Sequence, residues 1–231
     1  LENMKDKYST KKDTELSDTV KLPITETDFV SEFLTNFKPI KFLGKGAYGC
    51  VFEAESKLGF LEVRRAIKRI AISRSEEDMG YVLEPARKKQ DRLSRHKGIV
   101  KYYDAWIEIP PPGWQERADD ELLNELKLTR DIVQINYRDR FAFLYVSMEL
   151  CKSNLSEWLA ANQNRDLARM RFWFRQIVSA VEYMHEHGQI HRDLKPSNIA
   201  FAGEDHLKLC DLGSMGNRAF VGCHEVAKER T

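Results

Sequence analysis

The chain has 231 residues, of which 42% are hydrophobic and 32% are charged, and its net charge is +1. This composition is typical of a globular protein, and the length suits one domain with a tail. The balanced charge gives no indication of a nucleic-acid partner or of an anionic membrane surface. The sequence has no apolar run of about 18 residues, the length that a membrane-spanning helix needs.

The four cysteines are Cys50, Cys151, Cys210 and Cys223. They form no Cys-x-x-Cys pair and no His/Cys cluster with the spacing of a zinc site. We therefore predict free thiols in a reducing compartment.

Charged and small polar residues dominate residues 1–28, which we predict to be a flexible lead-in. Alternating polar and apolar residues over 39–72 predict strands on both sides of a Gly-rich turn. Residues 76–95 are typical of an irregular helix, and two further strands are expected over 99–107 and 141–150. These elements predict a twisted antiparallel sheet with one helix.

A segment of different character, residues 109–138, separates the last two strands. It opens with a run of prolines followed by Gly113 and continues with an acidic stretch over 116–125. We interpret it as an insertion, a loop with one or two helical turns. Because it offers little apolar surface, we expect it to be mobile and dispensable for folding.

The second half of the chain predicts a helical part that begins near Leu155. Its clearest element is a helix over 166–187, where apolar residues recur at three- and four-residue spacing before Gly188. A pair of short strands is expected over 199–201 and 207–210.

The first motif that carries chemistry is residues 44–51 (GKGAYGCV). Gly44, Gly46 and Gly49 would let the backbone approach phosphate groups without a Cβ in the way. The same spacing occurs in dinucleotide-binding folds, where a helix follows it, but strand-like residues follow Val51 here. The pattern favours a hairpin that covers a bound nucleotide. A Gly-rich turn without a ligand stays open as an alternative.

The second motif is residues 66–68 (AIK), in a predicted strand. Lys68 could neutralise the α- and β-phosphates of ATP. An exposed strand lysine is common, so this motif alone does not decide between binding and a structural role.

The third motif is residues 191–198 (HRDLKPSN), which follow the long helix. Phosphoryl transfer to a hydroxyl needs a carboxylate to accept the proton, an oxygen ligand for Mg²⁺ and a cation near the γ-phosphate. Asp193, Asn198 and Lys195 could supply these in turn. A string of this length in such a place is a specific indication of this chemistry.

The fourth motif is residues 211–213 (DLG), after the last predicted strand. Asp211 could hold Mg²⁺, although an Asp-x-Gly turn alone is more often structural. The four motifs in this order resemble those of eukaryotic protein kinases, and Lys195 is of the serine/threonine type.

The flanking residues resemble a narrower group, the kinases that phosphorylate the alpha subunit of translation initiation factor 2. The similar segments are 33–40 (FLTNFKPI), 68–70 (KRI), 96–106 (HKGIVKYYDAW) and 111–116 (PPGWQE). Within this group the chain is most similar to the PERK-like, endoplasmic-reticulum branch. The resemblance covers roughly residues 30–214.

The resemblance implies an α+β, protein kinase-like fold: an antiparallel-sheet small lobe over 29–150 and a partial helical large lobe over 151–231 that stops after the Asp-Leu-Gly motif. It implies ATP and Mg²⁺ as cofactors and a protein substrate, the alpha subunit of initiation factor 2. It also implies a cytoplasmic kinase region in a full-length protein that is anchored at the endoplasmic-reticulum membrane.

The resemblance also assigns roles to single residues. Lys68, Asp193 and Lys195 would be catalytic, with Asn198 and Asp211 as metal ligands. The nucleotide would contact Gly44, Gly46, Gly49, Val51, Ala66, Lys68, the gatekeeper Met148, and the hinge residues Glu149 and Cys151.

Departures from the family pattern are visible, besides the expected lack of the activation segment and of the later large-lobe helices after Asp211. The glutamate that should pair with Lys68 is not clear: Glu84 is the nearest acid, but Pro85 disfavours a helical conformation at residue 84. In the fourth motif Leu212 replaces the usual Phe, and we expect it to fill the same hydrophobic position.

Alternatives to an active kinase of this group stay open. The departures favour a pseudokinase or regulatory scaffold that binds nucleotide without catalysis. A cell-cycle kinase of the Wee1 type also carries Asp-Leu-Gly, although residues 103–106 and 111–116 argue against it. The basic stretch 87–101 is either a docking or homodimer surface of the small lobe or a solvated helix face.

Overall fold

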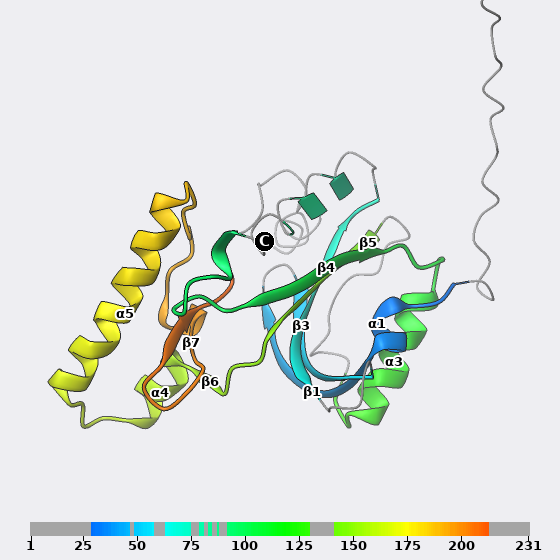
Figure 1. Cartoon of the computed structure of the whole chain (residues 1–231). Coiled ribbons are helices and arrows are strands. Elements are labelled where there is room, and N and C mark those ends of the chain that lie inside the picture. Colours follow the sequence, from blue (N-terminus) through cyan, green and yellow to red (C-terminus); the bar gives the residue numbers. More distant parts are fainter. Residues whose placement is uncertain are drawn as a thin grey trace, which may run out of the picture.

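The computed structural model describes residues 29–46, 49–57, 63–74, 79–80, 83–84, 87, 92–129 and 141–212. The predicted flexible lead-in over 1–28 lies outside these residues. The described chain forms two parts, a five-stranded sheet with helices on both of its faces and a smaller part built from helices and short strands (Figure 1). The predicted α+β fold class is confirmed.

The large sheet contains five strands that pair in an antiparallel manner in the order β1-β2-β3-β5-β4. They are β1 (Phe37–Gly46), β2 (Gly49–Ser56), β3 (Arg64–Ser73), β4 (Tyr102–Glu108) and β5 (Phe141–Glu149).

The Gly-rich motif forms the tip of a hairpin. β1 and β2 pair in register up to Gly46 opposite Gly49. A dinucleotide-binding fingerprint would instead connect a strand of a parallel sheet to a helix. The structure therefore excludes that alternative and confirms the hairpin.

Side chains alternate between the two faces of the sheet, as the period of two of a β-strand requires. One face carries Ile70, Ile72 and Leu144, with Leu83 from the helical residues 83–84 packed against them. The opposite face carries a second cluster, formed by Phe33, Phe52, Ile67, Trp106, Leu122, Phe143 and Tyr145 among others. Two further helices, α1 (Glu32–Asn36) and α3 (Trp114–Glu125), cover this second face (Figure 1).

Helix α3 contradicts our interpretation of residues 109–138 as a loop with one or two helical turns. It has twelve residues, and Gln115, Asp119, Leu122 and Leu123 are buried. These four residues recur at helical spacing and form one buried stripe. The acidic composition gave no indication of this buried stripe, because one of the acids, Asp119, is itself part of the buried face. The expectation that the segment has little surface to bury is therefore wrong.

Helix α1 is fixed to the sheet by a buried carboxylate, that of Glu108 at the end of β4. Glu108 accepts hydrogen bonds from the Ser31 hydroxyl at 2.8 Å, the Phe33 amide at 2.7 Å and the Trp106 indole at 3.0 Å. Three donors satisfy the carboxylate inside the protein, where an unpaired one would be costly. The single helix expected beside the sheet is thus joined by two others.

The second part begins with β6 (Ser153–Asn154) and α4 (Leu155–Ala161), so the helical part starts at Leu155 as predicted. A capping box between Asn154 and Glu157 fixes this start. The long helix α5 (Leu167–Glu186) then begins after its N-cap residue Asp166. Within the described residues, no helix combines the length and the apolar character needed to cross a membrane.

A turn of 3₁₀-helix, η2 (Pro196–Asn198), leads into the strand pair β7 (Ile199–Phe201) and β8 (Leu207–Leu209). Trp173 and Met184 of α5 are buried against these strands. Strand β8 also bonds to residues 98–100, which precede β4: the Leu209 amide donates to Gly98 at 2.8 Å, and the Val100 amide donates to Leu209 at 2.9 Å. Strand β8 therefore connects the two parts of the molecule.

Candidate functional site

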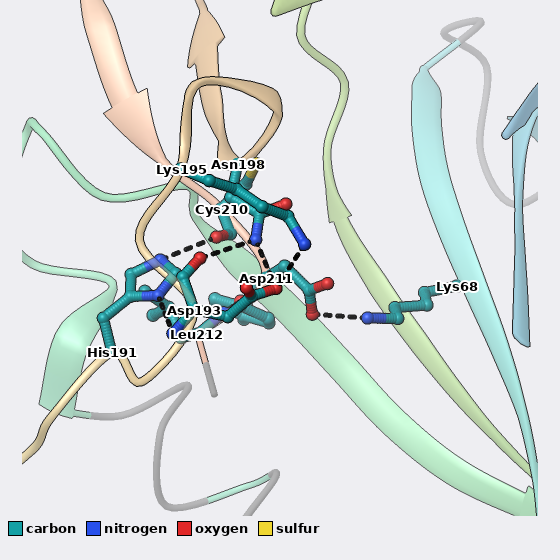
Figure 2. Close-up of polar contacts among 9 residues, drawn as sticks. Lys68, His191, Asp193, Lys195, Asn198, Cys210, Asp211 and Leu212 are labelled. Carbon is teal, nitrogen blue, oxygen red and sulfur yellow. Dashed lines mark hydrogen bonds and ion pairs between the residues drawn. The ribbon is translucent and has the colours of Figure 1, made fainter. Parts of the chain in front are cut away.

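The predicted catalytic loop is assembled around the carboxylate of Asp193 (Figure 2). The Lys195 ammonium lies 2.7 Å from its Oδ2 atom. The side-chain amide of Asn198 donates to the Asp193 carbonyl at 2.8 Å and to Oδ2 at 2.9 Å. Because both atoms of Asp193 can only accept, the nitrogen of Asn198 faces Asp193 and its amide oxygen faces away.

The charge state of Asp193 suits a proton acceptor. The hydrogen bond from Lys195 lowers the pKa of Asp193, and the one from Asn198 adds to this effect. Conversely, Asp193 raises the pKa of Lys195. The site therefore holds an exposed carboxylate and an exposed ammonium, both ionised at neutral pH.

His191 connects this loop to the residue before Asp211. Its Nε2 atom lies 3.0 Å from the Cys210 carbonyl, which can only accept, and its Nδ1 atom accepts from the Asp193 amide at 3.4 Å. These contacts fit the tautomer that carries its proton on Nε2. Sequence reasoning gave no role to this buried histidine, although it stands in the motif two residues before Asp193.

Lys68 and Asp211 meet between the two parts of the molecule (Figure 2). Lys68 lies in the middle of β3, opposite Val51 and Val146, and its ammonium contacts the Asp211 carboxylate. Asp211 has a φ of 55°, which is uncommon for a residue other than glycine. Its backbone is therefore held in a costly conformation that turns the chain at the site.

Glu84 lies in the helical residues 83–84, so the expectation that Pro85 would disfavour a helical conformation there is wrong. The steric effect of a following proline is a preference that tertiary packing can override, and Leu83 packs against the sheet. The side chain of Glu84 is exposed. Its pairing with Lys68 stays a prediction.

Leu212 is buried, with 5% of its surface exposed, in one cluster with Leu93, Ile99 and Trp173. Its amide donates to the Tyr102 hydroxyl at 3.4 Å. The expectation that a leucine fills this hydrophobic position is confirmed. Tyr102, which sequence reasoning did not single out, thus contacts the motif from β4.

Four of the predicted nucleotide-contacting residues meet in one hydrophobic cluster. Val51 of β2, Ala66 of β3, Met148 of β5 and Cys151 after β5 pack together with Val100 and Cys210. Ala66 and Met148 are direct partners across the strand pair. The structure therefore forms an apolar surface at the place where the sequence predicts an adenine contact.

The described cysteines are free thiols, as predicted for Cys50, Cys151 and Cys210. Cys223 lies outside the described residues. Burial raises the pKa of the Cys151 thiol to about 11 and that of Cys210 to about 12. Both thiols near the site are thus neutral at physiological pH and act as small apolar side chains.

Glu149 differs from the other predicted contacts, because its carboxylate is already engaged. It lies 2.8 Å and 2.6 Å from the Lys208 ammonium through its two oxygens and accepts from the Lys101 amide at 3.1 Å. Contact of Glu149 with an adenine ring would therefore come from its backbone.

Glycine occupies the positions of the hairpin for different physical reasons. A Cβ at Gly49 would lie 1.9 Å from the carbonyl oxygen of Arg69, so the close approach of β2 and β3 requires a glycine there. A Cβ at Gly44 would meet no atom of the described residues within 4 Å. Nothing in the described protein requires glycine at 44, which fits a role towards a ligand. Gly46 ends β1 at the tip.

The oxygens of Asp211 and Asn198 form a donor set that fits Mg²⁺. The described residues contain no group of three or more His, Cys, Asp or Glu side chains that could hold a metal. Magnesium does not need such a cage, since it commonly binds one or two protein oxygens and completes its shell with water and phosphate. The exposed Asp211 carboxylate and the amide oxygen of Asn198 suit this mode.

Comparison with known proteins agrees with this geometry. The protein kinase domain family model matches residues 37–219. The chain therefore belongs to the protein kinase family.

The relatives include kinases that are named for the alpha subunit of translation initiation factor 2. The chain is 32% identical to the interferon-induced, double-stranded RNA-activated protein kinase of Mus musculus, over 79% of this chain and 31% of that protein. It is 38% identical to eukaryotic translation initiation factor 2-alpha kinase 3 of Bos taurus, over 44% of this chain and 9% of that protein. It is 27% identical to the eIF-2-alpha kinase GCN2 of Arabidopsis thaliana, over 79% of this chain and 15% of that protein. The chain thus spans less than a third of the length of these relatives.

Proposed function

We propose that the protein is an ATP- and Mg²⁺-dependent serine/threonine protein kinase, with a small lobe over 29–150 and part of the large lobe over 151–231. The observation that carries the proposal is the carboxylate of Asp193, held by Lys195 at 2.7 Å and Asn198 at 2.9 Å. This arrangement presents an ionised proton acceptor beside a cation and a metal-ligating amide oxygen. Phosphoryl transfer to a hydroxyl needs these three groups together.

In this proposal each residue has one task. Asp193 accepts the proton of the attacking hydroxyl through its exposed carboxylate. Lys195 offsets the negative charge on the transferred phosphoryl group. Lys68 binds the phosphates, and the apolar cluster around Ala66 and Met148 receives the adenine ring. A bound Mg²⁺ would neutralise phosphate charge, with Asp211 and Asn198 as its protein ligands.

We further propose the alpha subunit of translation initiation factor 2 as the protein substrate. Two of the relatives are named as kinases of this subunit, and the segments 33–40 and 96–106 resemble that group. The location of the full-length protein at the endoplasmic reticulum and a homodimer through the small lobe stay predictions from the resemblance.

The proposal is tested with Asp193→Asn in the full-length protein. This change is nearly isosteric but removes the proton acceptor, so phosphorylation of the alpha subunit should fall about 10²–10⁴-fold. The shift in melting temperature caused by Mg²⁺·ATP should persist in this variant and disappear in Lys68→Ala. If the Asp193→Asn variant phosphorylated the alpha subunit as well as the unsubstituted protein, the proposal of an active kinase would fail. The alternative of a nucleotide-binding scaffold would then take its place. No thermal shift of the unsubstituted protein would reject nucleotide binding itself.

A further inference from the structure

An ion pair between Glu149 and Lys208 joins the end of β5 to the middle of β8. The Lys208 ammonium lies 2.8 Å from one carboxylate oxygen of Glu149 and 2.6 Å from the other. The side chain of Lys208 is 14% exposed and that of Glu149 is 25% exposed. This shielding separates the pair from exposed surface pairs, which contribute little.

Glu149 is also fixed through its backbone. Its amide donates to the Lys101 carbonyl at 2.8 Å, and its carboxylate accepts from the Lys101 amide at 3.1 Å. These reciprocal bonds hold the glutamate before any contact with Lys208 is counted. The pair therefore loses little side-chain entropy when it forms, unlike a pair between two free side chains.

The two residues lie on segments that lead to opposite ends of the candidate nucleotide site. Glu149 directly follows Met148, which lies in the apolar cluster at the adenine end. Lys208 belongs to the strand that leads through Cys210 to Asp211 at the metal end. The ion pair thus connects the segment that would hold the base with the segment that would hold the metal.

We propose that Glu149 and Lys208 are positioning residues that form a latch between the two lobes and hold the adenine end at a fixed position relative to Asp211. The latch rests on the proposed nucleotide site. A ligand such as Mg²⁺·ATP touches both ends at once, so it binds best when the ends are already in place. A ligand that touches the adenine end alone gains nothing from the latch.

The test compares two probes on the 231-residue chain, Mg²⁺·ATP and adenosine, which lacks the phosphates. Lys208→Met and Glu149→Gln should each weaken Mg²⁺·ATP about tenfold, as expected for the loss of a charge-assisted hydrogen bond. Their dissociation constants for adenosine should change less than about twofold. The double variant should be no weaker than either single variant, because one shared contact is lost.

A control is Arg169→Gln, which breaks a more exposed ion pair, with 36% and 46% of its two side chains exposed. Arg169 lies 2.6 Å from Asp205, away from the hinge, and belongs to α5. This variant should leave both dissociation constants unchanged. Equal weakening of Mg²⁺·ATP and adenosine in the latch variants would overturn the latch, since it would indicate general damage. Unchanged or tighter binding of Mg²⁺·ATP would also overturn it.

Amide hydrogen exchange of the nucleotide-free chain tests the latch without any ligand. Lys208→Met should accelerate exchange of the Val100 and Leu209 amides, which are hydrogen-bonded across the junction, and leave β2 and β3 unchanged. No acceleration would overturn the latch. If the unsubstituted chain fails to bind Mg²⁺·ATP, the proposed function fails, and the exchange result alone then decides whether the two lobes are latched.

Discussion

Arg69 and Asp119, which are 50 positions apart in the chain, form a buried ion pair that joins β3 to α3. Both guanidinium–carboxylate contacts are 2.6 Å, and the two side chains are 1% and 5% exposed. Arg69 directly follows Lys68, and the alternation of a strand directs these two side chains to opposite faces of the sheet. The strand that carries the candidate phosphate-binding lysine is therefore fixed from behind by the segment interpreted as an insertion.

Replacement of Asp119 by alanine should strongly destabilise the protein. Burial lowers the pKa of Arg69, but Asp119, with smaller effects of Cys50 and Tyr145, raises it, and the net pKa lies well above its ordinary value, so the guanidinium stays charged. Without its partner this buried charge should cost about 3–5 kcal/mol of the free energy of unfolding, measured by urea denaturation. Glu121→Ala, at an exposed position of the same helix, should cost less than about 0.5 kcal/mol. Similar values for the two variants would contradict the role of the pair.

Substitution by alanine should affect stability at Gly49 and nucleotide binding at Gly44. At Gly49 the new Cβ would collide with the Arg69 carbonyl, so the melting temperature should fall by an amount that corresponds to about 1–3 kcal/mol. At Gly44 the Cβ meets open space, so stability should hold while the thermal shift with Mg²⁺·ATP becomes smaller. An unstable Gly44→Ala variant would show that this glycine is structural.

Substitutions of Leu212 test how closely its position is packed. Leu212→Ala should cost about 2–5 kcal/mol of the free energy of unfolding, because it leaves a cavity beside Leu93 and Ile99. Leu212→Phe, which restores the more usual residue of the family, should still cost about 1–3 kcal/mol through overpacking. If the phenylalanine variant were more stable than the unsubstituted protein in chemical denaturation, the cluster would have unused space.

The pKa of Asp193 should depend on Lys195. The lowered pKa means that Asp193 stays ionised below its ordinary value of 3.8. The stability that the pair contributes is present above the pKa of the unfolded chain and is lost as the pH falls through the lowered folded value. Lys195→Met should move the midpoint of Asp193 back up, as measured by carbon NMR of its carboxyl group. Added salt should do the same in part, since the pair is exposed.

An internal control for this titration is Asp205. Its pKa is also lowered, mainly by a hydrogen bond from Arg169, and this pair does not involve Lys195. The midpoint of Asp205 should therefore stay unchanged in Lys195→Met. A parallel rise of both midpoints would indicate loss of structure in place of a local effect.

The parts of the site that the sequence predicted well are those in which short strings fix the chemistry. The catalytic string places Asp193, Lys195 and Asn198 within six consecutive residues, so their association needs little knowledge of the fold. Strand alternation similarly predicted the hairpin of β1 and β2. Each of these predictions depends on neighbours in the chain.

The parts that sequence reasoning missed depend on partners far apart in the chain. Nothing near Asp119 shows that its partner is Arg69, and nothing near Lys208 shows that its partner is Glu149. Acidic residues on a helix normally face solvent, so the average polarity of α3 argued against a buried face. Only the tertiary arrangement shows that one of these acids neutralises a buried cation.

The hydrogen bonds of Glu108 have a practical consequence for defining the domain. The family match begins at residue 37, but two of the three donors to this carboxylate, Ser31 and Phe33, lie before it. A chain that begins at residue 37 would keep Glu108 but lose two of the three hydrogen-bond donors to its carboxylate. The carboxylate would then be poorly satisfied, which is costly for a charged group. We therefore expect the smallest stable folding unit to begin before the family match at residue 37, and protease mapping should find the protected N-terminal edge before Ser31.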